Sequence, residues 1–143
     1  MANSTNAIDV KAAIVALIKG LPEATAEKWD TDWGFSKTPD RTWIYCGAVD
    51  WDSSEWVTNR SREEIFRVKT VVNIKRRRST PEQAEREATR IASLIEAAVK
   101  ASPNFGDGAV VTSSFMPRKL DSFPADDFCE AQFEADISVT ARF

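Results

Sequence analysis

The stretch CEAQFEADISVTARF, from Cys129 to Phe143, alternates without a break between small or apolar side chains and polar ones. Because successive side chains of a strand point to opposite faces, the pattern predicts a strand with one buried, apolar face and one solvated, charged face. These fifteen residues would span ~50 Å at about 3.3 Å each, whereas a compact chain of this length is ~35 to 40 Å across. We therefore expect the strand to bend or to extend past the rest of its domain.

Two earlier stretches are expected to pack around this strand. The sequence from Ile65 to Lys75 alternates in the same way, which makes it the natural partner of the terminal strand. A long amphipathic helix is predicted over Pro81 to Ala101, where apolar residues recur at helical spacing. Thr80, Pro81 and Gln83 match the N-cap, the first helical position and the capping box. We expect this helix to cover the dry face of the terminal strand.

The rest of the chain is less regular. The other expected elements are a helix from about Asn6 to Lys19, a short strand over Lys28 to Trp33, a clearer strand over Thr42 to Val49, and a strand that begins at Ala109 to Thr112. Two stretches that contain bulky apolar residues, 50–62 and 113–128, are interpreted as irregular loops.

Together these elements predict a single α+β domain over residues 1–143. The simplest architecture is a two-layer sandwich, in which an antiparallel or mixed sheet of about four strands carries two helices on one face. The chain is long enough to bury a core of that kind.

The composition argues against catalysis. The chain has no histidine, and so it lacks the commonest general base and transition-metal ligand. No serine, cysteine or threonine lies in a nucleophile motif, and neither a phosphate-binding loop nor a dinucleotide-binding motif is present. The two cysteines, Cys46 and Cys129, are expected to be buried thiols. We expect no enzyme activity and no cofactor.

The sequence also limits the partners and the location. A net charge of −3 argues against a chain whose main task is to grip nucleic acid by neutralising phosphates. The first residues lack the basic and apolar regions of a secretory signal, and no apolar run approaches the length that crosses a membrane. We expect a protein of the cytoplasm with no membrane partner.

Charged and aromatic clusters supply the candidate sites. Glu130, Glu134 and Asp136 share the wet face of the terminal strand, where a solvated acidic face is favoured over a cation site because the strand keeps them from converging. The next two clusters are the basic run Lys75, Arg76, Arg77 and Arg78, and the pair Trp51 and Trp56. For the basic run a solvated strand end is favoured, with an acidic partner surface and nucleic acid as alternatives. The two tryptophans are either core residues of a hairpin or exposed interface aromatics.

Four stretches in this order resemble a known family: EIFRVKTVVNI at 64–74, AEREATRIASLIEAAV at 84–99, PNF at 103–105 and ISVTAR at 137–142. With the N-terminal helix they span most of the chain and are similar to the tail terminator proteins of long-tailed, siphovirus-like bacteriophages. The likeness lies in the order of the elements and in the ending V-x-A-R, and it includes no catalytic signature.

This resemblance implies a structural protein of the virion tail that assembles in the host cytoplasm. Such a protein forms a homohexameric ring on the tail tube, stops its polymerisation and joins it to the head connector. The implied partners are other copies of the chain, the major tail tube protein and the head-tail connector or neck protein, while DNA passes through the channel without specific binding. A phage neck or head-tail completion protein and a small α+β binding module unrelated to phages are the alternatives.

In a ring of this kind, Glu130, Glu134 and Asp136 are candidates for the channel lining. The candidate contacts with neighbouring subunits or with the tube are Trp51, Trp56, Lys75, Arg76, Arg77, Arg78, Phe115, Met116, Leu120 and Phe123.

Overall fold

The computed structural model describes residues 7–34, 42–58, 61–106, 108–125 and 127–142, without the side chains of 53–58, 61, 124 and 125. The described residues form three helices and five strands. In chain order these are α1 (Ala7–Lys19), α2 (Pro22–Ala26), β1 (Asp30–Trp33), β2 (Thr42–Thr58), β3 (Ser61–Arg77), α3 (Pro81–Ala101), β4 (Val110–Ala125) and β5 (Phe128–Arg142).

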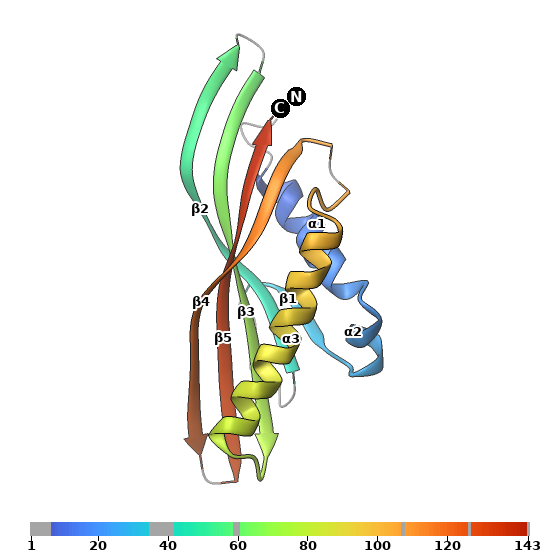
Figure 1. Ribbon diagram of the computed structural model, residues 1–143, viewed down its shortest axis with the longest axis vertical. Coiled ribbons are helices and arrows are strands. Elements are labelled where there is room, and N and C mark those ends of the chain that lie inside the picture. The colour runs from blue at the N-terminus through green and yellow to red at the C-terminus, as the bar shows by residue number, and fades with distance from the viewer. Residues whose placement is uncertain (1–6, 35–41, 59–60, 107, 126, 143) are drawn as a thin grey trace.

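The five strands form one mixed sheet in the order β1-β2-β3-β5-β4. The short β1 runs parallel to β2, and the other neighbours pair antiparallel. α1 packs on β1 and β2, while α3 packs on β3, β5 and β4, so that the helices lie on one side of a long, twisted sheet (Figure 1). The predicted α+β two-layer sandwich is confirmed, with α2 as an additional short helix.

The terminal strand has the partner and the cover that its sequence predicts. β5 pairs with β3 from Glu63 opposite Arg142 to Arg77 opposite Phe128. On its helix-facing side, Ile137 and Val139 are fully buried with the Phe66 ring. The sheet also extends past its cover, since the far ends of β2 and β3 reach beyond the helices (Figure 1).

The long helix begins and ends at the predicted residues, Pro81 and Ala101. The Gln83 amide donates to the Thr80 hydroxyl (3.2 Å), and the Thr80 amide donates to the Gln83 side chain (3.1 Å). This capping box satisfies two backbone donors that the first turn leaves free. Behind it, Ile91 and Ile95 bury the apolar stripe against the sheet.

Within the described residues, the two stretches interpreted as loops form strands, which corrects the sequence prediction. Residues 50–58 continue β2, and residues 113–125 continue β4. Register shifts interrupt β2 between Cys46 and Val49 and between Trp51 and Ser53, and they interrupt β4 between Val110 and Thr112 and between Pro117 and Lys119. Each β-bulge moves the following residues to the other face, so a strict alternation was not visible in the sequence.

The first bulge of β2 is a contact point for α1. The Lys11 Nζ of α1 donates to the Gly47 carbonyl (2.7 Å) and lies 4.4 Å from the centre of the Trp33 ring. Burial lowers the pKa of Lys11, since removal from water disfavours the charged form. For the same reason burial raises the pKa of the neighbouring Cys46 thiol to about 11.

The raised pKa of Cys46 predicts a pH-dependent stability. The thiol has an ordinary pKa of 9.0, so between pH 9 and 11 the unfolded chain releases a proton that the folded chain keeps. The stability is therefore complete below pH 9 and falls by about 2 to 3 kcal/mol as the pH rises through 11. Urea unfolding should be measured for the wild type and for Cys46→Ala at pH 8 and above pH 11. The difference in the free energy of unfolding between the two proteins should be smaller at the higher pH. An equal advantage at both pH values would contradict the burial effect.

Candidate assembly surfaces

The three carboxylates of the terminal strand lie on the open face, the sheet face that α1 and α3 do not cover. Each has a polar partner from a neighbouring strand. The Asn73 Nδ2 donates to Glu130 (2.8 Å), and the Lys69 Nζ lies 3.7 Å from Glu134. Asp136, whose side chain is only 14% exposed, binds Arg118 (2.9 Å) and Arg67 (3.5 Å). The shared face is as predicted, but it carries paired charges.

These pairs surround a small hollow of about 210 Å³. Its lining combines three carboxylates with three cations: Asp50, Glu134, Asp136, Arg67, Lys69 and Arg118. Arg67 also reaches Asp52 at 3.2 Å, so it bridges carboxylates of β2 and β5. Sequence reasoning missed Arg118 as part of this site because its stretch was interpreted as a loop. The predicted alternation of β3 already placed Arg67 and Lys69 on this face.

The basic run at the end of β3 does not form one patch. Lys75 and Arg77 lie on the open face, each 5.3 Å from the centre of the Phe128 ring. Arg76 lies on the helix-facing side, where it donates to the Thr42 hydroxyl (2.8 Å) and lies 3.8 Å from Glu87. Arg78 is exposed in the turn that follows, with a positive φ of 51°. Alternation along the strand therefore divides the four cations between two faces.

A second charged cluster ties α3 to the end of α2. The Arg90 guanidinium donates to Glu87 within α3 (2.7 Å) and to Glu27 just after α2 (3.2 Å). The hydrogen bonds from Arg90 hold the pKa of both carboxyl groups below its ordinary value. Because all three side chains remain partly exposed, solvent screens this cluster, and its contribution to stability is modest.

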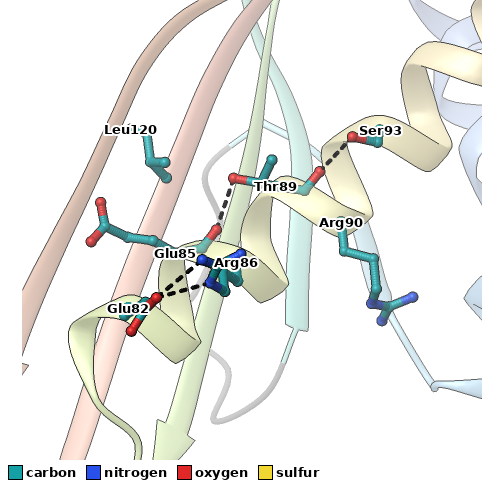
Figure 2. A pocket seen from close by; sticks show the side chains of 7 residues that line it. All are labelled: Glu82, Glu85, Arg86, Thr89, Arg90, Ser93 and Leu120. Carbon is teal, nitrogen blue, oxygen red and sulfur yellow. Dashed lines mark hydrogen bonds and ion pairs between the residues drawn. The ribbon is translucent and has the colours of Figure 1, made fainter.

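A groove of about 600 Å³ runs between α3 and β4. Figure 2 shows Leu120 of β4 facing the side chains of the first turns of α3, with Arg90 pointing away from it. The helix wall is polar: Arg86 pairs with Glu82 (3.1 Å), and Thr89 donates to the Glu85 carbonyl (2.8 Å). The seven lining residues are Glu82, Glu85, Arg86, Thr89, Arg90, Ser93 and Leu120. The two hydroxyl groups of the lining, on Thr89 and Ser93, both donate to backbone carbonyls of α3.

The candidate apolar contacts lie at opposite ends of the sheet. Trp51 on β2 is 46% exposed, with its ring 6.4 Å from Phe66. On β4, at the opposite edge of the sheet and separated from β2 by β3 and β5, Met116, Leu120 and Phe123 are exposed. Phe115 is half-buried and stacks on Phe133 with ring centres 6.4 Å apart. The Trp56 side chain lies outside the described residues.

Within the part of the chain that the structure describes, no group of three or more cysteine, aspartate or glutamate side chains could hold a metal ion. In the same part, none of the helices has the length and apolar character needed to cross a membrane.

Comparison with known proteins gives a match in structure. A chain of a solved structure titled "Virion of native gene transfer agent (GTA) particle" has a similar fold, with a TM-score of 0.62. The likeness is one of fold. The sequences are 12% identical, and the match covers 97% of this chain and 100% of that chain. No protein-family model matches the sequence, and a search of curated proteins found no match.

The position of Asp136 predicts its importance for stability. Asp136→Asn removes the carboxylate that Arg67 and Arg118 share, and we expect a loss of about 1 to 3 kcal/mol in the free energy of unfolding. Asp121→Asn is the matched control, because that side chain is 46% exposed and its ion-pair partner, Lys119, lies 3.9 Å away; its effect should stay within about 0.5 kcal/mol. Urea unfolding measures both, and equal effects would contradict this role of Asp136.

Proposed function

We propose that this chain is a structural protein of a phage-like virion and acts as a tail terminator. As such it forms a homohexameric ring that caps the tail tube, stops the growth of the tube and joins it to the head connector. The observation that carries the proposal is the fold shared with a chain of a gene transfer agent virion over nearly the whole of both chains. The order of the sequence elements, which resembles the tail terminators, supports the finer assignment.

The surface chemistry fits a subunit whose task is contact. Exposed apolar side chains lie on the two opposite outer parts of the sheet, with Trp51 on β2 and Met116 and Phe123 on β4. Burial of such side chains under a partner lowers the free energy of the assembly. The location we propose is the virion tail, with assembly in the host cytoplasm.

The open face is the proposed channel lining. Glu130, Glu134 and Asp136 lie there among cations, and Asp136 holds both Arg67 and Arg118. Arginines engaged by a carboxylate are less available to bind DNA phosphates, which is the contact that dominates non-specific DNA affinity. The carboxylates would thus let DNA pass without sticking, through pairing with the cations of the lining.

The exposed end of the basic run is the proposed contact with the tube or the connector. Arg77 and Arg78 are the exposed members of that run, and they lie where β3 ends. Arg76 is already engaged by Thr42 and Glu87, so we assign the contact to the other two arginines.

Termination is tested by adding the protein to polymerising tail tube protein and measuring tube lengths by electron microscopy. The wild type should cap tube ends and give shorter tubes of uniform length. Arg77→Glu with Arg78→Glu should weaken capping by about tenfold or more, since it reverses two charges at the contact. Arg86→Glu, which changes an exposed arginine of α3, is the control and should cap normally.

Tubes that grow to the same lengths with and without the wild-type protein would contradict the terminator function. Binding to head connectors without any effect on tubes would instead favour the neck or completion protein.

A further inference from the structure

Each edge of the sheet includes a stretch that no described strand covers. β1 pairs with β2 from Trp43 to Cys46, and beyond Cys46 no described residue pairs with the outer edge of β2. At the other end of the sheet, β4 has no described partner other than β5. An edge strand presents unpaired backbone N–H and C=O groups and is a template for another strand.

The pairing registers place the uncovered parts of the two edges in the same rows of paired residues across the sheet. Asp50 of β2 lies opposite Arg67, Arg67 opposite Ser138, and Ser138 opposite Ser114 of β4. The row that contains Asp50 therefore ends at Ser114. Residues 112–116 of β4 are level with the part of β2 that lies beyond its pairing with β1.

The other half of β4 is protected against pairing. Pro117 and Pro124 lack the N–H group that a ladder needs, and a bulge separates Pro117 from Lys119. Residues 112–116 contain no proline and pair with β5 without a register shift. Thr112, Ser114 and Met116 are exposed there. β4 is thus available for pairing in the same rows of the sheet in which the outer edge of β2 has no described partner.

The directions of the two edges are complementary. Three antiparallel steps separate β2 from β4, so β4 runs antiparallel to β2, and a second copy placed beside the first would continue the antiparallel sheet. Residues 112–116 of β4 carry no charged side chain, so this segment brings no carboxylate against Asp50 and Asp52 of β2.

We infer that residues 112–116 of β4 pair with the outer edge of β2 in a second copy of this chain, so that the sheet continues from one subunit to the next. The contact is head-to-tail, because each copy offers a different edge to each neighbour, and such contacts close into a ring when the rotation between copies allows it. The inference rests on the proposed function, since it names the contact that would join the subunits of the ring.

A pair of charge variants tests this contact. The acidic variant, Thr112→Glu with Ser114→Glu, places carboxylates on β4 against the native carboxylates of β2. The basic variant, Asp50→Lys with Asp52→Lys and Ser114→Lys, places lysines on both edges. Each variant alone faces like charges at every contact. In a mixture, β4 of the acidic variant can pair with β2 of the basic variant, and β4 of the basic variant can pair with the native, acidic β2 of the acidic variant. Every contact between two different variants then joins opposite charges, so an assembly in which the variants alternate is favoured.

Assembly is measured by sedimentation velocity and native mass spectrometry over a range of concentrations. We expect the wild type to assemble, each variant alone to assemble at least about tenfold more weakly, and an equimolar mixture to recover assemblies that contain the two variants in equal numbers. Thr89→Glu with Ser93→Glu adds two carboxylates to exposed positions on α3 and should assemble as the wild type does. Thermal unfolding of the dilute proteins shows that each variant is folded.

Three results would overturn the inference: a wild type that stays monomeric over the whole concentration range, a mixture of folded variants that gains no mass, or an equal loss of assembly in the α3 control. An edge strand of a different virion protein as the true partner would give the first result. Tube capping is not part of this measurement. Assembly edge to edge without capping would therefore remove the proposed function alone, whereas capping without recovery in the mixture would remove this inference alone.

Discussion

Pairing of β5 on both sides is the constraint on which the rest of the structure depends. β3 and β4 flank it along nearly its whole length, and α3 covers its apolar face. A shift of one residue in either ladder would turn Ile137 and Val139 toward solvent and Asp136 into the core. The register of β5 therefore fixes which face of the sheet is dry, and it also sets which parts of the two outer strands stand level with each other.

The sequence predicts the regular elements well, because their periodicity reflects burial on one face. β5, β3 and α3 lie where alternation, helical spacing and the capping box place them. The outer half of β2 and most of β4 could not be predicted in this way. Bulges near Gly47, Asp52 and Arg118 shift the side chains between faces, and β4 is exposed on both faces over much of its length, so no single apolar stripe marks these strands.

The candidate site was predictable in part for a related reason. A common face for Glu130, Glu134 and Asp136 follows from the alternation of one strand. Their partners come from other strands, such as Arg118 of β4, and only the register of the sheet brings them within reach. The ion pairs also change how this face would act on DNA. A carboxylate that binds an arginine makes that arginine less available to DNA phosphates, and this effect outweighs direct repulsion of the phosphates by the carboxylate.

The central claim is that the sheet built around β5 continues into a second copy through two open edges. Hydrogen exchange of backbone amides in the dispersed and the assembled protein tests it most directly, because pairing protects edge amides that otherwise exchange freely. We predict slower exchange on assembly within residues 112–116 of β4 and 47–58 of β2, with residues 119–125 unchanged. Assembly that leaves both edges exchanging as fast as in the dispersed chain would contradict the account.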